Sequence, residues 1–206
     1  PSVYLALLVA LLIWLRRPKL RRALRHSGNN VRIIQKDRAR DTLLGCGAIV
    51  LLALPMALLM FAIGHELQDG YEASEFTVAV GYALATTAPL LFQLQALRLF
   101  VAPGSIAAVH FGWREAGLKR LYRDLRWVVP TLTLLALLTA LTMRLETREW
   151  GSGLGRGMFV VLMFAFSVFF FRLSHPTGGV ISTLSQHNPE GLVHRLRVVW
   201  LLVLVG

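Results

Sequence analysis

The chain has 206 residues, of which 55% are hydrophobic and 16% are charged, and its formal net charge is +11. With a mean hydropathy of +0.59, it carries more apolar surface than a soluble core could bury, which excludes a soluble enzyme. Because backbone polar groups in hydrocarbon must pair within the chain, and the apolar runs are too long for barrel strands, the sequence predicts an all-α membrane protein.

Six apolar segments follow one another and predict a polytopic transmembrane bundle of about six helices, forming one domain over residues 1–206. The first and last segments are short, and we expect them to be truncated helices of a longer protein. The fourth and fifth segments hold about 16 apolar residues each, roughly 24 Å of helix, which is shorter than a bilayer core, so we expect both to extend into their flanks. The predicted helices span residues 3–15, 43–64, 76–101, 128–143, 158–173 and 198–206.

The charges of the connecting segments orient the chain in the membrane. Residues 16–41 hold ten basic side chains against two acidic ones, whereas residues 65–75 hold four acids and no Lys or Arg. Residues 102–127 are basic again, so the positive-inside rule places this segment and 16–41 in the cytoplasm and 65–75 outside. The mixed segment 144–156 then lies outside and 174–197 inside, which makes the alternation consistent over five loops.

Residues 113–127 have the spacing of an amphipathic helix with a basic face. Apolar residues recur at i, i+3, i+4 and i+7 from Leu118 to Leu125, and cations take the positions between them. Such a helix lies in the membrane interface with its cations among the lipid phosphates; the alternative is an ordinary basic loop. A weaker version of the pattern occurs at residues 20–25. The residues that we expect to anchor the chain at the lipid interface are Trp113, Lys119, Arg120, Arg123, Arg126 and Trp127, together with Arg21, Arg22 and Arg25.

Few polar groups lie within the apolar segments. Gln93 and Gln95 lie in the cytoplasmic half of the third segment, where an amide favours a partner helix, so they are candidates for intramembrane helix contacts. The alternative role for these glutamines is a transport site. Arg98 lies near the end of the same segment and can reach the headgroups. Pro130, at the start of the fourth segment, fits the first turn of a helix.

No arrangement typical of an enzyme or a metal site stands out. His65-Glu66 lacks the second histidine of a zinc-protease helix, and the histidines of the cytoplasmic loops share no metal-ligand spacing. The glycines of residues 151–157 lack the terminal Lys-Ser/Thr of a phosphate loop, and Cys46 is the only cysteine. We therefore expect no catalytic residue, no metal and no cofactor.

Several strings in the chain carry a family resemblance. They are DRARDTLLG (37–45), RLFVAPGSIAAVHFGW (98–113), LRWVVP (125–130), SHPTGGVIS (174–182) and NPEGLVHRLRVVWLLVLVG (188–206). Together they resemble the inner-membrane domain that precedes the channel module in large MscS-type mechanosensitive channels of the MscK and MscM kind. The strings lie mostly in the predicted cytoplasmic loops and none is a catalytic signature.

The resemblance implies a multi-pass protein of the bacterial inner membrane, with a periplasmic region upstream, a pore module downstream and a heptameric assembly. The whole channel would open under membrane tension during osmotic downshock, and this domain would be a non-pore, tension-sensing and scaffolding part. Its expected partners are membrane lipids and sister subunits, and not nucleic acid. Helices shorter than the bilayer would thin it locally, so that stretching the bilayer changes the fit between protein and lipid.

Two other functions stay open at this point. A fragment of a secondary transporter or lipid flippase would show inverted repeats and broken helices around midplane polar groups. A membrane-embedded enzyme would need acids or histidines gathered at one membrane face.

Overall fold

The computed structural model describes residues 2–30, 38–70, 73–105, 107, 115–146 and 153–174. The regular structure of these residues is entirely α-helical, which confirms the predicted class, and the predicted helix at 198–206 lies outside them. The helices are α1 (Ser2–Asn30), α2 (Arg38–Asp69), α3 (Glu75–Phe100), α5 (Glu115–Glu146) and α6 (Leu154–Ser174).

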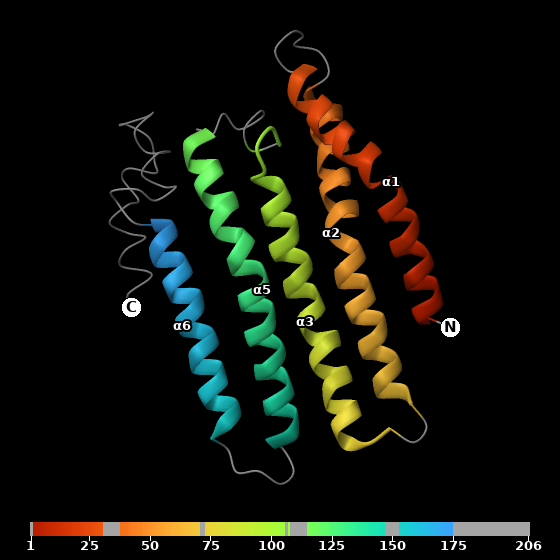
Figure 1. The fold of residues 1–206 in the computed structure, drawn as a ribbon, viewed down its shortest axis with the longest axis vertical. Helices are drawn as coiled ribbons and strands as arrows, with labels where there is room; N and C mark the ends of the chain where they lie inside the picture. The colour runs from red at the N-terminus through yellow and green to blue at the C-terminus, as the bar shows by residue number, and fades with distance from the viewer. Residues whose placement is uncertain are drawn as a thin grey trace.

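The helices stand side by side in one row, in the order of the chain (Figure 1). The pairs that pack extensively are α1–α2, α2–α3, α3–α5 and α5–α6, all of them neighbours in sequence. Consecutive helices run in opposite directions, so α1 and α3 end where α2 and α5 begin. We call this side of the array the basic end, because the described parts of the Lys/Arg-rich segments 16–41 and 102–127 lie there. The described helices therefore form an open, single-layer array.

Four helices of the described part are long and apolar enough to cross a membrane, namely α2, α3, α5 and α6. They contain the second, fourth and fifth predicted segments and all of the third except Val101. α2, α5 and α6 extend beyond the apolar residues at both ends. α5 has 32 residues and α6 has 21, which at 1.5 Å per residue gives about 48 Å and about 32 Å. Hydropathy marks only the apolar part of a helix, whereas the polar flanks continue the same backbone hydrogen bonds into water.

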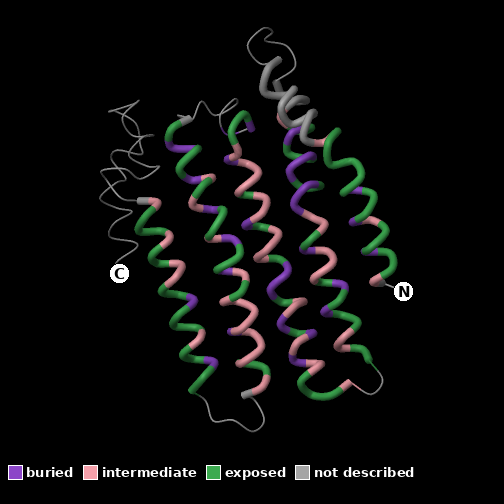
Figure 2. The backbone as a smooth tube through the Cα atoms, in the orientation of Figure 1, coloured by how far each residue is buried: buried purple, intermediate pink, exposed green. Residues whose placement is uncertain are grey.

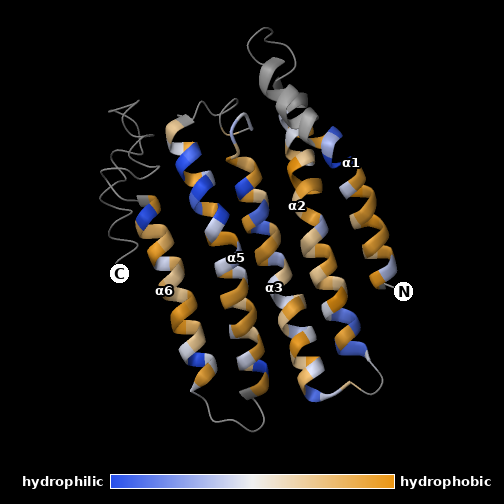
Figure 3. Ribbon diagram, viewed as in Figure 1, coloured by the Kyte–Doolittle hydropathy of each residue, from blue (hydrophilic) through white to orange (hydrophobic). Residues whose placement is uncertain are grey.

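Both predicted basic loops contain long helical parts among their described residues. α1 continues from its apolar first half through Pro18 to Asn30, and α5 begins at Glu115, well before the predicted start of the fourth segment. Pro130 consequently lies inside α5 rather than in a first turn. Figure 3 shows the hydrophilic start of α5 continuing directly into its hydrophobic part. A single α5 therefore replaces the separate interfacial helix and membrane helix that the sequence suggested.

At the basic end, an apolar cluster joins the first three helices. Ala48, Ile49 and Leu52 of α2 are buried, and Leu20 of α1 and Leu99 of α3 pack against them. Leu20 lies in the basic half of α1, so this packing attaches that half to α2 and α3. At the other end of α3, the side chain of Ser74 accepts a hydrogen bond from the backbone N–H of Thr77 and caps the helix.

α2 and α3 come into close backbone contact where Gly64 and Gly81 face each other. A Cβ atom added to Gly64 would lie 2.6 Å from the backbone nitrogen of Ala85 and from the carbonyl oxygen of Gly81. A Cβ atom added to Gly81 would in turn lie 2.7 Å from the carbonyl oxygen of Gly64. In lipid no hydrophobic effect drives helices together, so their association depends on close van der Waals packing. Small residues such as glycine allow the two backbones to approach closely enough for it. The side-chain amide of Gln68 donates to the Gly64 carbonyl oxygen at 3.0 Å.

We expect Gly64→Ala to destabilise the domain by about 1–3 kcal/mol, because the new methyl group meets backbone atoms that cannot rotate away. Gly47→Ala on the same helix is the matched control, since a Cβ atom there meets nothing within 4 Å. The control should leave stability unchanged or raise it by up to about 1 kcal/mol through helix propensity. Unfolding of the detergent-solubilised protein measures both, and equal effects would contradict the close contact.

Candidate functional site

A compact turn after α3 brings the end of α3 and the start of α5 together at the basic end. Gly104 adopts a positive φ of 73°, a backbone conformation that glycine reaches without strain. The chain then places Ser105 in a fully buried position, where its hydroxyl donates to the carbonyl oxygens of Leu99 (2.8 Å) and Phe100 (2.9 Å). Carbonyl groups in the last turn of a helix lack intrahelical partners. Residues 101–105 (VAPGS) of the string at 98–113 therefore form the C-terminal cap of α3.

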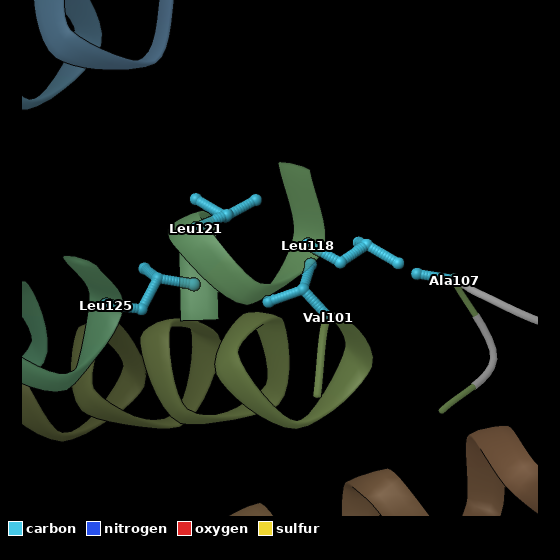
Figure 4. Packing of buried hydrophobic residues seen from close by; sticks show 5 residues of the cluster. All are labelled: Val101, Ala107, Leu118, Leu121 and Leu125. Atoms are coloured by element: carbon cyan, nitrogen blue, oxygen red, sulfur yellow. The ribbon is translucent and has the colours of Figure 1, made fainter. Parts of the chain in front are cut away.

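The buried apolar cluster at this turn connects α3 with α5. Figure 4 shows its members, which are Val101, Ala107, Leu118, Leu121 and Leu125. Phe169 and Leu173 of α6 pack against the same cluster. The leucines are the apolar face that the sequence spacing predicted, but they pack on the protein itself and not under lipid headgroups. The neighbouring helices offer this face an apolar surface, so the first part of α5 does not need the bilayer to bury it.

The predicted cationic anchors occupy the opposite, exposed face of α5. Lys119, Arg120, Arg123 and Arg126 are exposed, and the side chain of Trp127 is 72% exposed. The remaining predicted anchors are less fully described: Trp113 lies outside the described residues, and Arg21, Arg22 and Arg25 lie on α1 with side chains that are not described. The anchoring role of the whole set stays a prediction.

Two arginine–tyrosine contacts join α3 and α5, one at each end of the pair. The Arg98 guanidinium lies 5.3 Å from the centre of the Tyr122 ring. At the opposite end, the Arg144 guanidinium lies 5.6 Å from the centre of the Tyr82 ring. Such cation–π contacts contribute about 0.5–1 kcal/mol when exposed and about 2 kcal/mol or more when desolvated. Sequence reasoning missed both contacts and gave Arg98 only a role at the headgroups.

The other residues singled out from the sequence do not gather into a site. On α3, Gln93 is exposed and Gln95 is half-buried, and their role in helix contacts stays a prediction. His65 pairs with Asp69 one turn further along α2, with 2.9 Å between Nδ1 and the carboxylate oxygen. Among the described residues, no three side chains of the His, Cys, Asp or Glu type come together as a metal site would need.

A double-mutant cycle can measure the contact at the basic end. Arg98→Met and Tyr122→Leu should each destabilise the detergent-solubilised domain, and their coupling energy should be about 0.5–1 kcal/mol. Tyr122→Phe keeps an aromatic face and should retain most of the coupling, which separates the ring contact from the packing of the side chain. Additive effects of the two substitutions would show that the contact does not stabilise the α3–α5 pair.

Comparison with known proteins agrees with the resemblance seen in the strings. Residues 1–206 match the family described as mechanosensitive ion channel inner membrane domain 1. The chain is also similar to the miniconductance mechanosensitive channel MscM of Escherichia coli (strain K12), with 30% identity over 122 residues. The match covers 58% of this chain and 11% of that protein, so the chain corresponds to a small part of its relative. No solved structure matches the chain.

Proposed function

The chain belongs to the family of mechanosensitive ion channel inner membrane domains, and we propose that it is the non-pore part through which a larger channel senses tension. It is a multi-pass domain of the inner membrane. We propose further that the whole protein is a bacterial channel that opens during osmotic downshock. In this proposal its partners are membrane lipids and sister subunits of a homo-oligomer, with seven copies as the resemblance implies, and not nucleic acid.

The large apolar surface that the array leaves uncovered supports tension sensing. In the most apolar stretches of α2 and α3, 33% of the residues are buried, and this share falls to 17% in α5 and 6% in α6. Figure 2 shows that α6 and the coloured part of α1, at the two edges of the row, are mostly exposed. A single layer with so much apolar surface presents a large contact area to lipid, and tension acts on a membrane protein through that contact.

The charge-free length of the helices falls toward one edge of the array. From Glu75 to Arg98, α3 rises about 35 Å. The distance from Arg126 to Arg144 along α5 is about 27 Å, and the charge-free stretch of α6 between Arg156 and Arg172 is about 24 Å. The helices are longer than their apolar segments, yet the charge-free stretches of α5 and α6 are shorter than a hydrocarbon core of about 30 Å, whereas that of α3 exceeds it. We therefore assign the proposed mismatch with the bilayer to the charge-free stretches of α5 and α6 and not to the whole helices.

This gradient supplies a mechanism for the proposed function. The resting bilayer must thin, or arginine side chains must reach outward, wherever the α5–α6 edge contacts lipid, and both carry an energetic cost. Tension thins the bilayer and lowers that cost. We propose that the open channel exposes more of this edge than the closed one, so that tension shifts the population toward the open state.

The continuous helices favour this function over the rival ones. A transporter fragment would need helices broken around a midplane site, whereas α2, α3 and α5 each run unbroken for 26 residues or more. The matching family is one of ion channels and not of enzymes. We propose that the domain itself has no catalytic role and binds no cofactor or metal.

Lengthening the charge-free stretch of α6 tests the mechanism in the full-length channel. Arg156→Leu should lower the free energy of opening by about 1 kcal/mol per subunit, because the α6 edge would then fit the resting bilayer. The midpoint tension of opening in excised patches should fall accordingly. Arg156→Lys keeps the cation and should open at the wild-type tension. An unchanged or raised midpoint for Arg156→Leu would overturn the proposed role of this edge.

A further inference from the structure

One exposed face of α5 carries both cations and apolar side chains in a continuous stripe. Arg120, Arg123 and Arg126 are exposed and follow one another at intervals of three residues. Trp127, Pro130 and Leu134 are also exposed and continue the same face toward the apolar half of the helix. We call these six residues the α5 stripe. Residues three and four apart lie on one side of an α-helix, so the stripe runs along a single surface.

The packing of α5 fixes the direction in which the stripe faces. Leu118, Leu121 and Leu125 on the other side of the helix are buried in the cluster with Val101. The Arg98–Tyr122 contact adds a second attachment to α3 at the same level. Since this end of α5 is packed on its neighbours, it cannot rotate to bury the cations or to lie flat in the interface. The cations are therefore held at a defined place on the surface of the array.

The spacing along the stripe matches the depth of a phospholipid. Tryptophan and arginine are typical of the boundary between hydrocarbon and headgroups, which puts Arg126 and Trp127 at that boundary. Arg123 and Arg120 follow about 4.5 Å and about 9 Å further along the helix. A headgroup layer is roughly 5–8 Å thick on each side of the bilayer, so Arg123 lies within it and Arg120 at its outer edge. Pro130 and Leu134 continue into the hydrocarbon, where acyl chains would lie beside them.

The charge of the stripe selects an anionic headgroup. Three guanidinium groups face outward, and Asp124, an acid of the same turns, is half-buried. One guanidinium group can donate two parallel hydrogen bonds to two oxygens of the same phosphate. Cations near an anionic leaflet each favour binding to anionic lipid, and a fixed group of three favours one lipid over a diffuse cloud of counterions.

We propose that the α5 stripe is a binding site for an anionic phospholipid, with the headgroup on Arg120, Arg123 and Arg126 and the acyl chains along Trp127, Pro130 and Leu134. This inference deepens the proposed function by naming the lipid class that the tension-sensing domain holds. It rests on that function only in assuming that α5 crosses the membrane, because lipid binding is measured without channel opening.

The test uses the full-length protein in nanodiscs that contain phosphatidylcholine with or without phosphatidylglycerol. Native mass spectrometry after release into detergent measures the retention of phosphatidylglycerol relative to phosphatidylcholine. The triple variant Arg120→Gln, Arg123→Gln, Arg126→Gln should lose the preference for phosphatidylglycerol by about tenfold. An unchanged preference would overturn the proposal.

A matched control removes the same number of charges from the same end of the array. Arg16→Gln, Arg17→Gln and Lys19→Gln change exposed cations of α1 and should leave the preference within about twofold of wild type. If this control loses as much as the stripe variant, the preference comes from general surface charge and the site does not exist. The six substituted cations of the two triple variants are all exposed. Both variants should therefore keep the wild-type unfolding temperature, which is measured for each.

Two further measurements separate the ligand and the function. Glycerol phosphate, which has a headgroup but no acyl chains, should not displace phosphatidylglycerol; competition equal to that of the lipid would overturn the lipid assignment in favour of a free phosphate. The midpoint tension is recorded for the same variants. A stripe variant that loses lipid preference but opens at the wild-type tension would support the binding site and count against a role of α5 in sensing.

Discussion

Hydrocarbon offers no hydrogen-bonding partner to backbone N–H and C=O groups, so a chain with this many apolar residues must pair its backbone internally. The described helices meet that requirement one by one, and each can then stand in lipid without being enclosed by the others. This explains why a single row suffices. A soluble protein of the same composition would have to close its helices around a core, whereas here lipid covers the faces that the row leaves open.

α5 shows how one helix can serve two environments. Near the basic end, its leucines pack on the turn after α3 and on α6, while its arginines face outward. Further along, the outward face becomes apolar as the helix enters the proposed hydrocarbon region. The chain stays helical through this change. The arginine–tyrosine contacts attach α5 to α3 at both ends of the pair.

Part of the candidate site could be predicted from residue spacing, and part could not. The three-and-four spacing from Leu118 to Leu125 identified the apolar face of α5 and the cations opposite it. Spacing did not show what covers that face, since lipid and protein are equally apolar partners. The facing glycines Gly64 and Gly81 and the Arg98–Tyr122 contact join residues from different helices, and no local pattern records which helices become neighbours.

The sequence by itself determined the class of the protein, and four of its six predicted helices are long and apolar enough to cross a membrane in the described part. It could do so because length, hydropathy and charge act within each segment and against the bilayer. Its strings also pointed to the family that the comparison found. The tertiary structure alone decided that the described helices form an open row, that α1 and α5 extend into the basic segments, and that the start of α5 packs on protein. Those outcomes depend on shape and on contacts between distant residues, where the free-energy differences are set by packing rather than by composition.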